Sequence, residues 1–253
     1  MKYFDAFSGY GGFSLGIQRA YELSKVGTES ENSTNIKSQP SQYGERPFCV
    51  GYSEVDRYAI QVYKKHFPYE ECEQCKNKRI EKQISISQNG QEKIGSSGDG
   101  HHETDRNMRH GGQPSKECFN NCQCKHKPYG DITKIDPTTL PDFDLLTGGV
   151  PCQSWSIAGK RGGFEDERGN MWFQFSRILR EKHPKFFLAE NVKGLLSHDG
   201  GKSMERICEE LCGCGYAIDF EVLNAKNFGV PQNRERVFII GIRLDLLDEC
   251  QVF

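Results

Sequence analysis

Strand-like and helix-like patterns alternate along most of this 253-residue chain, and this alternation restricts its fold more than any other feature. Lys2 to Phe7 is a short apolar stretch that runs into the glycine turn "SGYGG". The following "FSLGIQRAYEL" has the i, i+3 and i+4 apolar spacing of a helix. A strand, a glycine turn and a helix in this order are typical of the first βαβ unit of a nucleotide-binding sheet.

The same alternation continues to the end of the chain. "PFCVGYSEVD" and "RYAIQVYKKHF" form a second strand and helix pair. Further strands are predicted at 144–147, 185–189, 217–223 and 237–242, and further helices at about 170–181 and 201–212. This order predicts an α/β fold with a parallel, doubly wound, Rossmann-like sheet, and we assign residues 1–253 to one domain.

Two polar segments interrupt the pattern. Thr28 to Glu45 is predicted to be a surface insertion. Tyr69 to Pro128 is longer, and its middle, residues 76–117, holds four isoleucines and one methionine as its only large apolar residues, too few for a core of its own.

Cysteine clusters flank the second insertion. "CEQC" provides Cys72 and Cys75, and "CFNNCQCKH" provides Cys118 and Cys122. These four thiols form a candidate structural zinc site, with Cys124 and His126 as alternative ligands. The spacing is not that of a standard zinc finger, so a disordered insertion with free thiols is the other interpretation.

Composition narrows the setting. The net charge of −2 excludes a protein that is basic over its whole surface, so any contact with nucleic acid is local or shared with another component. Apolar runs such as "VFIIGI" are far shorter than the about 20 residues of a spanning helix, and no signal peptide is evident. We therefore expect no membrane contact, and a cytoplasmic location in which the eleven cysteines stay reduced.

Candidate cofactor residues follow the first strands. Gly9, Gly11 and Gly12 leave backbone N–H groups free to face a ligand, although close packing of turn and helix would also explain them. Glu54 stands where such folds bind ribose hydroxyls, and Asp131 lies at another predicted loop end. Each carboxylate also has an ordinary interpretation as a solvated group at a helix start.

Candidate catalytic residues follow the later strands. Cys152, in "TGGVPCQSWSIAGKRGG", comes after the strand "DLLT" at the sheet edge where ligand crevices form. A thiolate needs an electropositive setting, which Lys160 and Arg161 would supply, whereas a buried, inert thiol is the alternative. Glu190 and Asn191 end the next predicted strand, and Arg234 and Arg236 precede the last. Considered one at a time, Glu190, Arg234 and Arg236 are equally well explained as ordinary charged side chains on the surface.

Together, the motifs resemble a known family. "FDAFSGYGGFSLG", "GYSEVD", "YGDIT", "GGVPCQSWSIAGKRGGFEDERG", "AENVKGL" and "VPQNRERVFIIG" follow one another in the order of the DNA cytosine-5 methyltransferase motifs. The similarity covers the chain outside its two insertions. It implies an S-adenosylmethionine-dependent enzyme of DNA methylation or restriction–modification that flips a cytosine out of double-stranded DNA.

The resemblance also implies residue roles. Cys152 would add to cytosine C6, Glu190 would hold N3 and the exocyclic amine, and Arg236 with Arg234 would contact the O2 side and the DNA backbone. Asn191 would position Glu190. Phe7 would stack on the cofactor adenine and Glu54 would bind its ribose. The other expected cofactor contacts are Gly9, Gly11, Gly12, Asp131 and Ile132.

The sequence departs from the family at its end. Members continue after the "VFIIGIR" strand into a target-recognition domain and two final motifs, whereas this sequence ends 11 residues after Ile242. We therefore expect the catalytic half of a split enzyme, with a second polypeptide that carries those parts. The alternatives are a tRNA cytosine-5 methyltransferase and a truncated, non-catalytic remnant that only binds cofactor.

Overall fold

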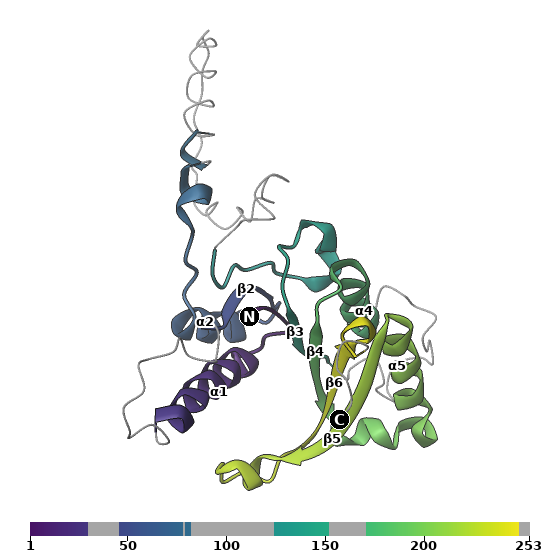
Figure 1. The fold of residues 1–253 in the computed structure, drawn as a ribbon. Helices are drawn as coiled ribbons and strands as arrows, with labels where there is room; N and C mark the ends of the chain where they lie inside the picture. The colour runs from purple at the N-terminus through teal and green to yellow at the C-terminus, as the bar shows by residue number, and fades with distance from the viewer. Residues whose placement is uncertain (30–45, 78, 82–123, 152–170, 248–253) are drawn as a thin grey trace, which may run out of the picture.

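The computed structural model describes residues 1–29, 46–77, 79–81, 124–151 and 171–247 (Figure 1). Six strands form one sheet in the order β2-β1-β3-β4-β6-β5. The strands are β1 (Lys2–Ala6), β2 (Phe48–Ser53), β3 (Leu145–Gly149), β4 (Phe186–Val192), β5 (Tyr216–Asn224) and β6 (Glu235–Arg243). Each overlaps a predicted strand, because the alternating or continuous apolar pattern marks its buried face.

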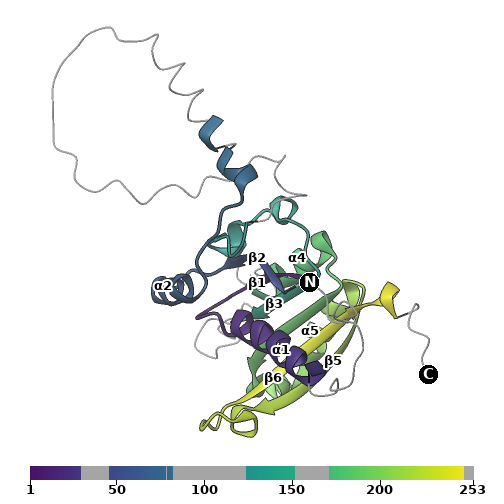
Figure 2. The ribbon, with the colours of Figure 1, turned by 60° about the vertical axis from the view of Figure 1, so that its left-hand side comes forward.

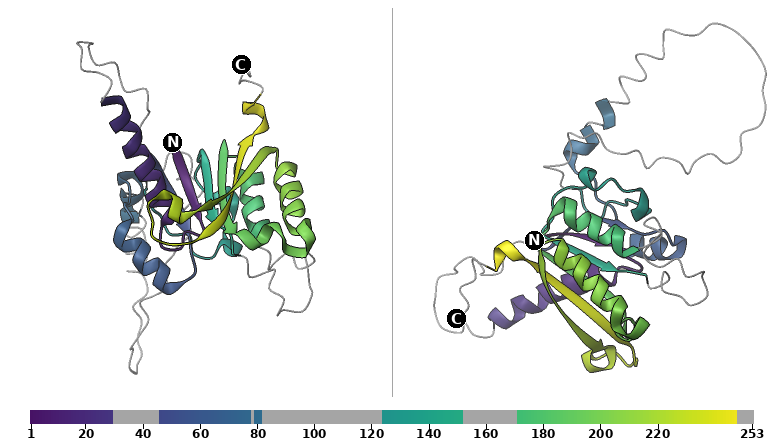
Figure 3. Two further views of the ribbon diagram at one scale, coloured as in Figure 1. Left: turned by 90° about the horizontal axis from the view of Figure 1, so that it is seen from below. Right: turned by 90° about the vertical axis from the view of Figure 1, so that its right-hand side faces the viewer.

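Helices cover both faces of the sheet (Figure 3). Helices α1 (Gly12–Glu29) and α2 (Arg57–His66) lie on one face, and α4 (Met171–Lys182) and α5 (Lys202–Gly213) lie on the other. This arrangement confirms the doubly wound, Rossmann-like prediction. None of the helices in the described ranges is both long and apolar enough to cross a bilayer.

The prediction of a wholly parallel sheet is wrong for one strand. Strands β2, β1, β3 and β4 pair in parallel, but β6 pairs antiparallel with both β4 and β5. A parallel connection needs a crossover of about a dozen or more residues. The short link between Asn224 and Glu235, which includes a 3-10 turn at Ala225–Phe228, instead closes a hairpin.

The reversal of β6 places its first residues beside the carboxyl ends of the parallel strands. Arg236 pairs with Val192 at the end of β4, and Ile242 pairs with Phe186 at its start. The carboxyl ends of β1, β3 and β4 and the amino end of β6 therefore meet at one edge, as Figure 2 also shows for β6 and the strands beside it.

A continuous apolar core joins the sheet to α4 and α5. Phe4, Leu146, Phe175 and Phe187 are fully buried, and Phe187 packs edge-on against Phe175. Opposite Phe187 stands Gly241, where any Cβ would overlap the Phe187 ring. The glycine is therefore needed for close packing of β4 against β6.

The insertions are described only at their ends. Thr28 and Glu29 lie in α1, and residues 30–45 and 82–123 lie outside the described residues. Residues 126–130 run along the outer edge of β2, where the N–H of His126 donates to the Cys49 carbonyl and the N–H of Tyr52 donates to the Lys127 carbonyl, each at 2.9 Å. The last part of the Tyr69 to Pro128 segment therefore adds to the sheet.

Candidate active site

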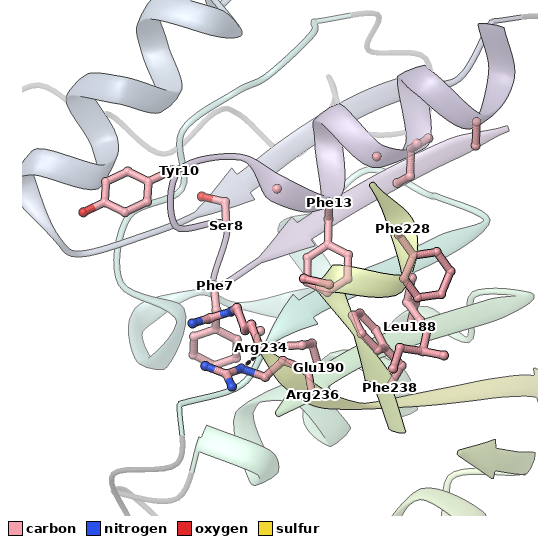
Figure 4. A pocket seen from close by; sticks show the side chains of 17 residues that line it. Phe7, Ser8, Tyr10, Phe13, Leu188, Glu190, Phe228, Arg234, Arg236 and Phe238 are labelled. Atoms are coloured by element: carbon pink, nitrogen blue, oxygen red, sulfur yellow. Dashed lines mark ion pairs between the residues drawn. The ribbon is translucent and has the colours of Figure 1, made fainter. Parts of the chain in front are cut away.

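A cavity of about 850 Å³ opens at the carboxyl edge of the sheet (Figure 4). It lies between the glycine turn after β1, the first turns of α1, and the ends of the later strands. Its lining consists of Phe7, Ser8, Tyr10, Gly12, Phe13, Gly16, Ile17, Ala20, Gly149, Leu188, Glu190, Leu223, Ala225, Phe228, Arg234, Arg236 and Phe238. Five of the residues predicted for the site, Phe7, Gly12, Glu190, Arg234 and Arg236, are thus brought to one cavity.

An ion pair occupies the polar end of this cavity. The Arg236 Nε lies 2.8 Å from the Glu190 Oε1, and both side chains are about one-fifth exposed (Figure 4). Partial burial strengthens such a pair relative to one on the open surface. Arg234 points into the same cavity from the end of the β5–β6 link and is more exposed. The site therefore presents one carboxylate held by one guanidinium, with a second guanidinium beside it.

The Asn191 side chain has different partners from those expected. Asn191 is buried, its Nδ2 donates to the Val150 carbonyl at 3.0 Å, and its Oδ1 accepts the Val192 N–H at 2.8 Å. It thus holds the chain that leads into Pro151, and within the described part of the chain its side chain makes no hydrogen bond with Glu190. Asn191 was expected to position Glu190, but its side chain instead bonds the chain that leads to Cys152.

The predicted nucleophile falls outside the described part of the chain. Residues 152–170, which include Cys152, Lys160 and Arg161, are not among the described residues, so their roles stay predictions. The described approach to Cys152 is closely fitted: a Cβ on Gly149 would lie 3.3 Å from the Glu190 Oε2. Glycine at this position lets the chain before Pro151 pass directly beside the Glu190 carboxylate.

The turn after β1 has an unusual backbone. Phe7 has a φ of 57°, a left-handed conformation that costs energy for a bulky residue. Its ring packs on the core and lines the cavity beneath the two arginines (Figure 4). Next to it, the Ser8 Oγ is buried and has no hydrogen-bond partner among the described residues, although it lies in the cavity wall. Sequence reasoning missed Ser8, which stands inside the quoted glycine motif.

The three glycines of the turn have different tasks. A Cβ on Gly9 or Gly12 would meet nothing within 4 Å, so both leave open space. Gly11 has a φ of 90°, and its Cβ would lie 2.6 Å from the Phe67 ring. Gly11 is therefore required by packing of the turn on α2, while Gly12 begins α1 at the cavity.

Glu54 braces the same turn. Its carboxylate accepts three backbone N–H groups at 2.8 Å, from Gly9, Val55 and Asp56. Asp131 lies one residue after Gly130, whose carbonyl accepts from the N–H of Glu54 at 3.1 Å. Glu54 and Asp131 are thus near neighbours in the fold, beside the glycine turn, although neither lines the cavity.

Asp131 and Ile132 also have local structural roles. The Asp131 Oδ1 accepts the Thr133 hydroxyl at 2.7 Å and the Thr133 N–H at 3.0 Å, and these bonds lower the pKa of Asp131. Ile132 is buried in the main core. The expected cofactor contacts of these two residues stay predictions.

A buried polar chain lies beneath the turn. Asp5 accepts hydrogen bonds at 3.0 Å from the hydroxyls of Ser14 and Thr147. Burial raises the pKa of Asp5 to about 7. From Ser14 the chain continues through the Tyr63 hydroxyl at 3.0 Å to the His126 Nδ1 at 3.1 Å. It connects the start of α1 with the segment beside β2.

The other end of the cavity is apolar. Phe13 and Ile17 of α1 face Leu188, Phe228 and Phe238, as Figure 4 shows for the four labelled members of this group. Phe228 is 65% exposed, which is unusual for a phenylalanine. We call this end the apolar groove, lined by Phe13, Ile17, Ala20, Leu188, Leu223, Phe228 and Phe238.

Among the described residues, the structure brings together two of the predicted zinc ligands and one of the alternative ligands. The sulfurs of Cys72, Cys75 and Cys124 all lie within 4.8 Å of one another. Cys118 and Cys122 lie outside the described residues, and their participation stays a prediction. Cys124, expected only as an alternative ligand, is the buried member of the cluster.

Comparisons with known proteins identify the family of this chain. The family model for C-5 cytosine-specific DNA methylases matches residues 108–251. The orphan methyltransferase M.SPRI of Bacillus phage SPR is 58% identical over 119 residues, 47% of this chain and 27% of that protein. The type II methyltransferase M.HhaI of Haemophilus parahaemolyticus is 48% identical over 120 residues, 47% of this chain and 37% of that protein.

A solved structure supports the fold. A prophage-encoded protein of E. coli, assigned as a DNA modification methyltransferase, has a TM-score of 0.53 at 21% identity, covering 98% of this chain and 48% of that one. The chain thus spans about half of this structure and about a third of the curated relatives' lengths. Because the family model matches more than half of the sequence, this chain belongs to the C-5 cytosine-specific DNA methylase family.

Proposed function

We propose that this chain is the catalytic part of an enzyme that transfers a methyl group from S-adenosylmethionine to C5 of cytosine in double-stranded DNA. The observation that carries the proposal is the Glu190–Arg236 pair, which lies beside Gly149 at the carboxyl edge of the sheet, three residues before Cys152. The two relatives named above are called methyltransferases, and the matching family acts on cytosine C5 in DNA.

The described residues fit an S-adenosylmethionine molecule. The cavity has room for it, the Phe7 ring offers a stacking surface, and Gly12 leaves the first N–H groups of α1 open. The unpaired Ser8 hydroxyl suits a polar group of the ligand. When bound, S-adenosylmethionine supplies the methyl group. We place Glu54 at its ribose, with Asp131 and the neighbouring Ile132 at its adenine.

Cys152 is the proposed nucleophile. Its thiolate adds to cytosine C6 and forms an S–C6 bond, and the electron pair of the C5–C6 bond then makes C5 nucleophilic. After C5 gains the methyl group, C5 loses its proton and the S–C6 bond breaks, which restores the double bond and releases the thiolate. A cytosine that reacts in this cavity has to be flipped out of the duplex.

Glu190 and Arg236 assist the addition. Glu190 takes a hydrogen-bonding position at N3 and the exocyclic amine, where it stabilises the charge that develops on the ring. Arg236 holds the Glu190 carboxylate through its Nε at 2.8 Å and contacts the O2 side of the base. Arg234, more exposed on the same side, contacts the DNA backbone.

We further propose that a second polypeptide completes the enzyme. The apolar groove beside the site suits an amphipathic segment, and matched relatives extend well beyond the region shared with this chain. The net charge of −2 leaves this chain few means of gripping DNA phosphates. The second polypeptide would carry the target-recognition domain and the segment that fills the groove.

The catalytic proposal is tested by covalent trapping. DNA with 5-fluorocytosine at the target should yield a complex that survives denaturation, because fluorine does not leave C5 as the proton does. The assay uses the chain together with the product of the adjacent reading frame. Cys152→Ser should abolish trapping, and Cys212→Ser, at an exposed thiol of α5, should leave it unchanged. Trapping that persists in Cys152→Ser would refute the assignment of the nucleophile.

The split arrangement has its own test. The chain is assayed alone and with the second polypeptide for transfer of labelled methyl groups to DNA and, in parallel, to tRNA. Ile17→Glu in the groove should weaken complex formation, whereas Val62→Glu on exposed α2, outside the groove, should not. Robust site-specific methylation of DNA by the chain alone contradicts the split enzyme. Methyl transfer to tRNA contradicts DNA as the substrate. No methyl transfer by the chain, either alone or with the second polypeptide, favours a non-catalytic remnant.

We also propose that the cysteine-containing insertion holds a structural zinc ion. Three of its thiols are gathered in the described part of the chain. Because the Cys152 sulfur supplies the nucleophile in the proposed mechanism, this zinc would act on structure and not on methyl transfer.

A further inference from the structure

We infer that Cys72, Cys75 and Cys124 bind one Zn²⁺ ion, and that this ion fixes the strand-like segment 126–130 onto β2 and thereby the adenine side of the cofactor site. The metal site stands on the cysteine geometry alone. Its effect on the cofactor rests on the proposed function.

The sulfur geometry matches a thiolate zinc site. Tetrahedral coordination with Zn–S bonds of about 2.3 Å places pairs of sulfurs about 3.8 Å apart. The Sγ atoms of Cys72 and Cys124 lie 3.6 Å apart, too far for a disulfide, and Cys75 completes a triplet within 4.8 Å. Three thiols at this spacing leave the fourth tetrahedral position to a further ligand or water.

Cys124 is held in place within the cluster. Its Sγ is buried and accepts the backbone N–H of Cys72 at 3.3 Å and the Tyr69 hydroxyl at 3.6 Å. Hydrogen bonds to the ligating atoms orient the ligands of a metal site. The two strongest requirements of such a site, converging sulfurs and donors to them, are both present.

The ends of the insertion otherwise have few ties. Cys72 and Cys124 are 52 positions apart, and holding such distant positions together costs loop-closure entropy. Besides the bonds to the Cys124 sulfur, the described ends are joined by two backbone hydrogen bonds between Glu70 and Lys125 and by the exposed ion pair of their side chains. Exposed ion pairs contribute little, so a metal ion would be the main cross-link at this point.

The cross-link leads directly to the cofactor side. After Cys124 the chain pairs with β2 as far as Gly130, whose carbonyl accepts from the Glu54 N–H and, at 2.7 Å, from the Ser53 hydroxyl. Asp131 follows at once. On the inner side, His126 reaches the first turns of α1 through the Tyr63 and Ser14 hydroxyls. A metal ion at Cys124 would therefore restrain both the loop that contains Asp131 and the hydrogen-bonded chain from His126 to Ser14 beneath the glycine turn.

The metal site is tested first with Co²⁺ as a spectroscopic probe. The full chain, reduced and stripped with a chelator, should bind one Co²⁺ with intense thiolate-to-metal absorption that one equivalent of Zn²⁺ removes. Cys75→Ser and Cys124→Ser should each lose this absorption, and Cys212→Ser should keep it. If the chain does not bind one equivalent of Co²⁺, or if Cys212→Ser loses the absorption as fully as the other two variants, the proposed metal site is wrong.

The restraint is tested by hydrogen exchange with and without Zn²⁺. Zinc should slow exchange at the amides of Tyr52, Glu54 and Tyr129 at least about fivefold, while amides of β5 stay unchanged. Cys75→Ser, which changes a less buried thiol and should keep the fold, should show the metal-free rates whether or not zinc is added. Identical exchange in the two states overturns the restraint.

The cofactor effect follows by linkage. S-adenosylhomocysteine should bind the zinc-loaded chain at least about fivefold more tightly than the metal-free chain. Equal affinities overturn the coupling while the metal site stands. If neither form binds S-adenosylhomocysteine, with or without the second polypeptide, the proposed function and the coupling both fail, and the Co²⁺ and exchange results still decide the metal site.

Discussion

Asn191 donates a hydrogen bond of 3.0 Å to the carbonyl of Val150, and this bond ties the end of β4 to the chain two residues before Cys152. Both groups are buried, so an unpaired Val150 carbonyl would carry a desolvation penalty. The carboxylate of Glu190 and the approach of Cys152 are thereby linked through one pair of adjacent residues on β4. The Glu190 side chain faces the cavity, and the Asn191 side chain holds Val150 in the chain before Cys152.

Replacing Asn191 with Asp should disturb the loop without removing the side chain. A carboxylate facing the Val150 carbonyl loses the Nδ2 donor, which costs about 1–3 kcal/mol in a buried place. We expect trapping of 5-fluorocytosine DNA to slow at least about tenfold, with S-adenosylhomocysteine affinity within about twofold of wild type. Trapping kinetics and calorimetry measure the two effects. Wild-type trapping by the variant would mean that the bond is dispensable for the nucleophile.

Glu190→Gln should reduce methyl transfer much more than cofactor binding. The amide keeps the size of the side chain but loses the ion pair with Arg236 and the charge that assists the addition. Groups of this kind contribute about 10²–10⁴-fold to the rate, so we expect a loss in that range under single-turnover conditions. A loss of S-adenosylhomocysteine binding with an unchanged transfer rate would show that the carboxylate is structural.

Asp5 should make stability depend on pH. Burial raises its pKa from 3.8 to about 7, so the folded chain holds this proton more tightly than the unfolded chain. Stability from this group is therefore complete below about pH 4 and falls as the pH rises to about 7, by up to about 4 kcal/mol.

Asp5→Asn isolates that contribution. The variant has no charge to bury, so its free energy of unfolding, measured with urea at about pH 5 and pH 8, should fall less between the two values than that of wild type. Asp142→Asn, at an exposed carboxylate, should behave as wild type. Parallel pH profiles for Asp5→Asn and wild type would show that Asp5 ionises in both states alike.

Gly241→Ala should destabilise the sheet. The new methyl group would overlap the Phe187 ring, and overpacking of this kind typically costs about 1–3 kcal/mol. Gly213→Ala, at the end of α5 with nothing within 4 Å of its Cβ, should be neutral or slightly stabilising. Urea unfolding compares the two, and an unchanged midpoint for Gly241→Ala would mean that β4 and β6 separate easily.

Local patterns predicted every strand and each of the four main helices in the described ranges to within a few residues at most ends, except that α1 extends further. These features depend on apolar periodicity and on glycine, which are written into neighbouring residues. The place of Glu190 at the carboxyl edge of the sheet was also predictable, since it ends a predicted strand. Arg236 reaches the same edge only because β6 runs antiparallel to β4, which the prediction of a parallel sheet did not include.

Relations between distant residues were not predictable in the same way. Nothing near β6 in sequence states that it runs against β4, and nothing near Asn191 states that its partner is Val150. Gly11 was expected either to serve a ligand or to pack closely, and its packing partner Phe67 directly follows α2, far from it in sequence. Such contacts depend on how elements meet, which periodicity within one element does not encode.

The direction of β6 also determines how long a tether must be if the proposed second polypeptide is fused to this chain. The strand passes the groove at Phe238 and ends with Arg243 beside the start of β4, so its last five residues carry the chain about 17 Å beyond Phe238. A flexible tether fused after Leu247 would have to cover that distance again, which takes at least about five fully extended residues. In a single-chain version, tether length would therefore tune the effective concentration of the grafted segment at the groove, with shorter tethers unable to reach it at all.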